Sequence, residues 1–113
     1  IQYAITWPER RPGILPPFPF TKYPKLEFLA PDRGKFICLE LAYEALRQGD
    51  SFPCYLNAAN EVLVSRFLRK EISWMQIGQK LSMLLENHKK QKQLTLESIF
   101  EIDCEARREA SSI

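Results

Sequence analysis

The residues best suited to chemistry lie in one short stretch, LNAANEV, Leu56–Val62. Asn57, Asn60 and Glu61 place two carboxamides and one carboxylate among apolar neighbours, where they could contact a ligand or begin a helix. Asparagine is among the strongest helix N-caps, and the helix dipole favours a glutamate in the first turn. We therefore predict that Asn57 caps a helix and that Asn60 returns a hydrogen bond. An additional contact of this stretch with a neighbouring loop or domain stays open.

The sequence contains few of the residues and motifs from which other catalytic sites are built. His88 is the only histidine, and the three widely spaced cysteines, Cys38, Cys54 and Cys104, have no C-x-x-C motif, so we expect half-buried, reduced thiols. The sequence contains neither a phosphate-binding glycine motif nor a G-x-S-x-G motif. Three glutamate pairs are spaced four apart, and we expect solvated surface rather than cation ligands at Glu40/Glu44, Glu97/Glu101 and Glu105/Glu109. We predict no catalytic, cofactor-binding or metal-ligating residue.

Composition describes an ordinary globular chain. It has 113 residues, 45% of them hydrophobic, and a formal net charge of +2, which suggests one domain with a modest core. No apolar run reaches the roughly 20 residues of a membrane span. The basic run His88–Gln93 is expected to be a solvated helix end. A weaker alternative is nucleic-acid binding through His88–Lys92, Arg107 and Arg108, which the small net charge disfavours.

The first third of the chain is rich in proline. Seven of the eight prolines precede position 32, which predicts an extended linker, with one possible short strand at KLEFLAP, Lys25–Pro31. The sequence P-P-F-P at 16–19 weakly matches a ligand of SH3 domains, but a structural linker is favoured. Ile1–Trp7 has helical spacing and ends at Pro8. Because the chain starts with Ile1 rather than Met, we expect it to come from a longer protein.

After the linker, apolar residues recur at helical spacing in four segments. The predicted helices cover 36–48 before Gly49, Asn57 to about Lys70, the segment from the capping box Ser73–Gln76, and the segment from about Thr95. Their predicted inward residues are Phe36, Leu39, Ala42, Tyr43 and Leu46; Ala59, Val62, Leu63 and Phe67; Trp74, Ile77, Leu81, Leu84 and Leu85; and Leu96, Ile99, Phe100, Ile102 and Ala106, with EARRE (105–109) as the exposed end. We predict an all-α fold, a small four-helix bundle preceded by a proline-rich extended linker.

These segments also resemble the C-terminal part of the 1-deoxy-D-xylulose 5-phosphate reductoisomerase family. The resemblance is carried by LAYEAL (41–46) with LNAANEV (56–62), by ITWPER (5–10), by LEFLAPDRGKF (26–36) and by IDCEAR (102–107), all in the family's order and spacing. It covers essentially the whole chain. One departure is Ile37, where the family commonly has a proline.

The resemblance implies a division into a remnant of the catalytic domain (1–10), a linker (11–35) and a C-terminal four-helix bundle (36–113). It further implies a homodimeric, cytoplasmic parent enzyme of non-mevalonate isoprenoid biosynthesis. The family uses NADPH and Mg²⁺ or Mn²⁺ to convert deoxyxylulose phosphate to methylerythritol phosphate, with these sites upstream of Ile1. We therefore expect neither cofactor on this chain, which should be inactive alone. The predicted partners are its own catalytic and NADPH-binding domains, not nucleic acid or membrane. The alternative is a free-standing helical interaction module with a proline-rich arm.

Overall fold

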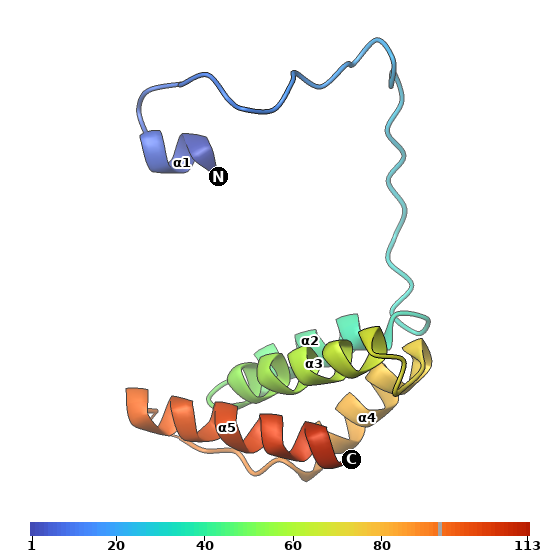
Figure 1. Cartoon of the computed structure of the whole chain (residues 1–113), viewed down its shortest axis with the longest axis vertical. Coiled ribbons are helices and arrows are strands. Elements are labelled where there is room, and N and C mark those ends of the chain that lie inside the picture. The colour runs from blue at the N-terminus through green and yellow to red at the C-terminus, as the bar shows by residue number, and fades with distance from the viewer. Residues whose placement is uncertain (93) are drawn as a thin grey trace. The chain divides into compact units, whose positions relative to one another are not determined.

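The structure, a computed structural model, describes residues 1–92 and 94–113. Within these ranges all regular structure is helical, as predicted. The chain divides into two compact units, Ile1–Ala30 and Pro31–Ile113. Figure 1 shows α1 in the first unit and the other four labelled helices in the second.

The first unit contains one short helix, α1 (Gln2–Thr6), which confirms the helix predicted before Pro8. The Gln2 side chain holds the chain that follows, because its Nε2 donates to the carbonyl oxygen of Pro12 at 3.0 Å. Phe18 packs against Phe20 and Tyr23, with ring centroids 4.9 and 5.7 Å away.

The short strand predicted at KLEFLAP is wrong. Residues 24–32 lack regular secondary structure, and the described part of the chain contains no strand that could pair with them. A strand needs the hydrogen bonds of a neighbour, so alternating apolar residues alone do not make one. The side chains of Leu26 and Phe28 are 63% and 88% exposed.

The second unit consists of four helices: α2 (Ile37–Gln48), α3 (Phe52–Leu68), α4 (Trp74–Asn87) and α5 (Leu96–Ser112). α3 is central, since it packs against α2, α4 and α5, and its most extensive contact is with α5. Figure 1 shows α3 and α5 lying along one another.

The core of this unit lies where α3, α4 and α5 meet. Buried alanines on α3 (Ala58, Ala59) and α5 (Ala106, Ala110) let the two backbones approach closely, and larger side chains of α4 fill the remaining space. The fully or nearly fully buried members are Tyr55, Ala58, Ala59, Leu63, Ile72, Ile77, Leu81, Leu84, Leu85, Ile102, Ala106 and Ala110.

Three of the predicted helix ends are confirmed. At the start of α4, the side-chain Oε1 of Gln76 accepts from the backbone N–H of Ser73 at 2.7 Å. At the start of α5, Thr95 Oγ1 accepts from the backbone N–H of Ser98 at 3.2 Å. Gly49 ends α2 with φ of 67°, a left-handed conformation that glycine adopts without strain.

The predicted start of α3 at Asn57 is wrong. The helix begins five residues earlier, at Phe52, with Ser51 at the cap position. Pro53 fits this first turn because the first N–H groups of a helix have no partner within the helix. Asn57 therefore lies inside α3 and caps nothing.

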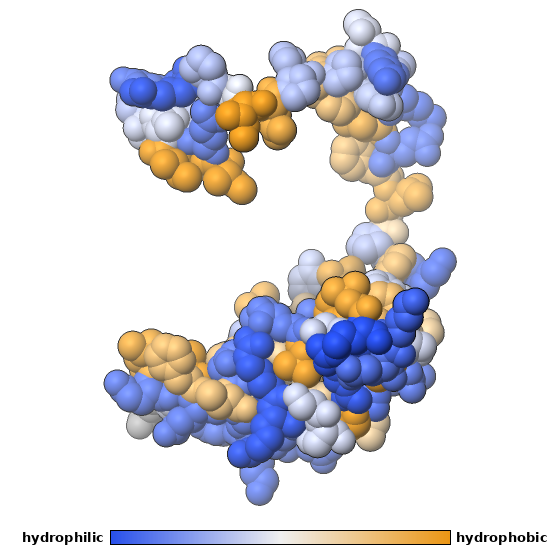
Figure 2. All heavy atoms as spheres, viewed as in Figure 1, coloured by the Kyte–Doolittle hydropathy of each residue, from blue (hydrophilic) through white to orange (hydrophobic). Residues whose placement is uncertain are grey.

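Parts of the predicted inward faces are wrong, although most of the inward residues predicted for α3 and α4 are buried. α2 is apolar on two sides, and the side with the small Ala45 packs on the other helices, with Leu41 partly buried against the core. Tyr43 and Leu46, on the predicted side, are 43% and 69% exposed. The first turns of α4 and α5 extend past the core, which leaves Trp74, Leu96, Ile99 and Phe100 exposed together with Phe36 at the start of α2. Figure 2 shows the resulting apolar patches on an otherwise largely hydrophilic surface.

Candidate functional site

The three polar residues of LNAANEV lie on one face of α3. Asn57 and Glu61 are exposed, and Asn60 is half-buried. Positions three and four apart in a helix are neighbours, and Asn57 Nδ2 donates to Glu61 Oε1 at 3.3 Å. The stretch thus presents two features, a charged contact at Glu61 and a carboxamide at Asn60.

Glu61 ties α3 to α5. Its Oε2 accepts from Arg107 Nη2 at 2.7 Å, and Arg107 Nε donates to Asp103 Oδ2, also at 2.7 Å. The Asp103 carboxylate, with Glu61 second, raises the pKa of the Arg107 guanidinium. These contacts join two of the sequence segments singled out above, LNAANEV and IDCEAR. These contacts fix one helix against the other, since the charged guanidinium binds a carboxylate on each helix.

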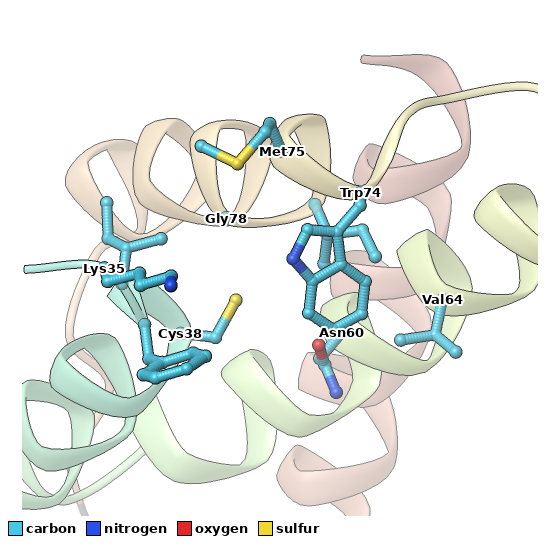
Figure 3. Close-up of a pocket in the computed structure, with 10 residues that line it drawn as sticks. Lys35, Cys38, Asn60, Val64, Trp74, Met75 and Gly78 are labelled. Carbon is cyan, nitrogen blue, oxygen red and sulfur yellow. The ribbon is translucent and has the colours of Figure 1, made fainter. Parts of the chain in front are cut away.

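Asn60 faces a groove between α2, α3 and α4. The groove has a volume of about 280 Å³. Its walls are mostly apolar, and they are formed by Lys35, Phe36, Ile37, Cys38, Asn60, Val64, Trp74, Met75, Ile77 and Gly78. Figure 3 shows the Asn60 carboxamide below the indole of Trp74, with the Cys38 thiol directed toward the same space from α2. Burial raises the pKa of that thiol.

The Asn60 carboxamide has no side-chain hydrogen-bond partner among residues 1–92 and 94–113. It is accessible through the groove rather than sealed in the core, since no buried side-chain nitrogen or oxygen of the described residues lacks a partner. It therefore offers one donor group and one acceptor to whatever enters the groove.

A second polar cluster lies at the other end of α3. Ser51 is fully buried, and its Oγ lies 2.8 Å from His88 Nε2 and accepts from the backbone N–H of Gln91 at 2.9 Å. The His88 ring stacks on Tyr55, with centroids 4.0 Å apart, and the Tyr55 hydroxyl donates to the carboxylate of Glu109.

This cluster contains a serine–histidine contact like that of a hydrolase, but a substrate has no access to the serine. A nucleophile must reach substrate, whereas the Ser51 hydroxyl is sealed inside the unit and bound by two neighbours. Burial lowers the pKa of His88, although Glu105 and Glu109 oppose the shift. The same burial, followed by the Glu109 contact, raises the pKa of Tyr55. The cluster holds the segment after α4 against the start of α3.

The sequence predictions missed this cluster. The run His88–Gln93 was predicted to be a solvated helix end; 89–92 are exposed, but His88 packs inward, and Gln93 lies outside the described residues. Glu109 was predicted to be solvated, yet it is half-buried and bound to Tyr55. Glu105 and Arg107 are also half-buried rather than exposed, whereas Arg108 is exposed as predicted. Ala106 is buried, in agreement with its place among the predicted inward residues. In the sequence, the one feature that could have indicated this cluster was a single histidine beside a predicted helix end.

The remaining candidate chemistry is sparse in the described part of the chain. No three side chains of His, Cys, Asp or Glu gather there in a way that could hold a metal ion. The three cysteines are free; only Cys54 is half-buried as predicted, while Cys38 and Cys104 are exposed. None of the described helices is both long enough and apolar enough to cross a membrane.

Fold and contacts together define a small helical domain in which polar side chains join one helix to another. The family described as the DXP reductoisomerase C-terminal domain matches residues 1–109, and the chain belongs to this family.

Similar proteins agree with this assignment. The chain is 51% identical over 111 residues to the 1-deoxy-D-xylulose 5-phosphate reductoisomerase of Protochlamydia amoebophila (strain UWE25). The match covers 98% of this chain and 29% of that protein. It is 46% identical over 110 residues to the 1-deoxy-D-xylulose 5-phosphate reductoisomerase of Chlamydia trachomatis serovar D, and the match covers 97% of this chain and 29% of that protein. The reductoisomerase from Zymomonas mobilis in complex with NADPH has a TM-score of 0.85 at 34% identity, over 97% of this chain and 29% of that one.

A further DOX-P reductoisomerase structure, in complex with magnesium, has a TM-score of 0.81 at 32% identity and covers 97% of this chain and 30% of that one. The chain thus spans about three tenths of the length of these relatives. These matches do not favour the alternative of a free-standing interaction module.

Proposed function

We propose that this chain is the C-terminal structural domain of a reductoisomerase that converts 1-deoxy-D-xylulose 5-phosphate to 2-C-methyl-D-erythritol 4-phosphate in non-mevalonate isoprenoid biosynthesis. The observation that carries the proposal is the match of residues 1–109 to a family described as the C-terminal domain of that enzyme. The relatives bear the enzyme's name and are more than three times as long.

In this proposal the chemistry belongs to the part of the polypeptide that precedes residue 1. That part would bind NADPH and Mg²⁺ or Mn²⁺; the two similar structures are complexes with NADPH and with magnesium. Residues 1–10 would complete the catalytic domain, 11–35 would be the linker, and 36–113 the helical bundle. The parent enzyme would be a cytoplasmic homodimer.

The proposed role of the bundle is to hold the catalytic domain in its working geometry. Two features support this role. α3, α4 and α5 share one core, against which Leu41 of α2 packs, so the bundle can act as a rigid body. The contact of Glu61 with Arg107 fixes α3 against α5. The part of α3 that carries Asn60 would pack against the preceding domain.

The test compares three proteins: the natural full-length polypeptide, the same polypeptide without residues 31–113, and the 113-residue chain alone. NADPH oxidation is followed with deoxyxylulose phosphate and Mg²⁺, and folding by far-ultraviolet circular dichroism. We expect turnover only in the full-length protein and a helical spectrum for the 113-residue chain. Turnover by the chain alone, or a shortened enzyme as active and as heat-stable as the full-length one, would refute the proposal.

The intact mass of the natural product distinguishes the alternative function. A mass several times the 13.2 kDa of this chain is expected for a domain of a long enzyme. A natural product near 13.2 kDa would favour the interaction module instead.

A further inference from the structure

We propose that the groove between α2, α3 and α4 receives an apolar side chain and its adjoining peptide group from the part of the same polypeptide that precedes residue 1. This inference rests on the proposed function and deepens it, because it names the face of the bundle that is covered and the chemistry of what covers it.

The walls of the groove call for an apolar occupant. Phe36, Trp74 and Met75 are large apolar residues that line it, and they are 51%, 66% and 63% exposed. Such residues gathered around one hollow, rather than scattered singly, mark an interaction site. The volume of about 280 Å³ is ample for one side chain, since an apolar cavity of roughly 150 Å³ holds benzene.

Asn60 adds a polar requirement to this apolar space. Its carboxamide faces the groove and has no side-chain hydrogen-bond partner in the described parts of the chain. An occupant without polar groups would remove water from the carboxamide and leave it unsatisfied, which costs free energy. A peptide group offers the matching acceptor and donor, so a backbone segment carrying an apolar side chain satisfies both the walls and Asn60.

The preceding part of the polypeptide is the favoured source of that segment. Relatives that match this chain extend over more than three times its length, and the matching family is described as the C-terminal domain, so more than two thirds of such an enzyme lies before the groove. A covalently linked partner also has a high effective concentration, which a second copy of the chain lacks at dilution.

Two native thiols provide the test without any substitution. Cys38 lines the groove and Cys104 lies on α5 away from its lining, and both are exposed. Reaction with N-ethylmaleimide is measured for each thiol by peptide mass spectrometry, in this chain and in the full-length enzyme at the same pH. We expect the full-length enzyme to slow labelling of Cys38 by about tenfold or more, because only molecules with the groove open react. The rate at Cys104 should change little.

The same measurement separates the other outcomes. Equal Cys38 rates in both proteins, or equal protection of both thiols, would overturn the inference. Protection that disappears on dilution would overturn it in favour of a second copy. If the enzyme needs residues 31–113 for activity while Cys38 stays unprotected, the proposed function stands and this inference alone fails.

A matched pair of variants tests the role of Asn60 in the full-length enzyme. Asn60→Ala removes the carboxamide in the groove, whereas Asn57→Ala removes one on the exposed side of the same helix. We expect Asn60→Ala to speed labelling of Cys38 several-fold and Asn57→Ala to leave it unchanged, with both variants keeping the helical spectrum. Equal effects of the two variants would contradict the pairing of Asn60 with the occupant.

Discussion

Gly78 marks the closest approach of α4 to α2. A Cβ atom placed on this buried glycine would lie 2.3 Å from Ile37 Cγ2, with Cys38 Sγ next at 3.5 Å. Real Cβ atoms do not approach another carbon that closely, so Gly78→Ala must move Ile37 or separate the helices. The predicted perturbation is therefore steric and specific to one methyl group.

Two opposing effects determine how much Gly78→Ala changes the free energy of unfolding. Alanine in place of glycine inside a helix gains about 1 kcal/mol in helix propensity. Overpacking a filled contact costs about 1–3 kcal/mol. Ile37 is branched at Cβ, which restricts its rotation away from the added methyl group. We expect Gly78→Ala to lower the free energy of unfolding by about 0–2 kcal/mol.

Removing the Cγ2 methyl group of Ile37 should reverse the sign of the effect of Gly78→Ala on the free energy of unfolding. In an Ile37→Ala background, Gly78→Ala should raise the free energy of unfolding by up to about 1 kcal/mol, because only the propensity term remains. Urea unfolding of the four proteins of this cycle gives the coupling between the two sites, expected at about 1–3 kcal/mol. If Gly78→Ala stabilises the chain by about 1 kcal/mol with Ile37 in place, the close approach of α2 and α4 is refuted.

Three further predictions concern the core and the cluster at His88. Leu63→Ala, at a fully buried site, should lower the free energy of unfolding by about 2–5 kcal/mol in urea, and a smaller loss would mean that the site collapses. Tyr55→Phe removes the hydroxyl bound to Glu109 and should cost about 1–2 kcal/mol by thermal unfolding; no loss would show that the contact contributes nothing. Burial lowers the pKa of His88 against the opposing Glu105 and Glu109, so the folded state binds fewer protons than the unfolded one. Stability should be full above about pH 6.5, the ordinary pKa of histidine, and fall as the pH drops through it, whereas His88→Gln should lose this dependence.

The sequence was sufficient to predict the helices and most of the buried sides of α3 and α4, but not the buried side of α2. Periodic apolar residues and local end signals such as Ser73–Gln76 and Gly49 depend only on neighbours in the chain, and they were confirmed. The orientation of α2 depends on its packing partners. Both of its sides are apolar, and the fold buries the one with the small Ala45 because a small side chain permits close approach.

The candidate site was predicted only in part, because its contacts join residues that lie far apart in the sequence. Asn57 was assigned to a cap because local rules favour asparagine there. The cap position of α3 is instead held by Ser51, whose hydroxyl makes no capping hydrogen bond and contacts the distant His88. Glu61 does make a specific contact, yet its partner Arg107 lies 46 residues away, beyond the reach of any spacing rule within one helix.

The contacts along α3 fix the wall of the groove that carries Asn60. Ser51 holds the N-terminal end of the helix through His88, and Glu61 holds its middle through Arg107. At the C-terminal end, Arg66 Nη1 donates to the carbonyl oxygens of Ala110 and Ile113 at 2.6 and 2.8 Å, which satisfies the last carbonyls of α5. Because side-chain contacts fix α3 at both ends and in the middle, the helix cannot slide without breaking one of them. A surface on α3 that is held this firmly can bind a neighbouring domain with less loss of conformational entropy than a mobile surface would.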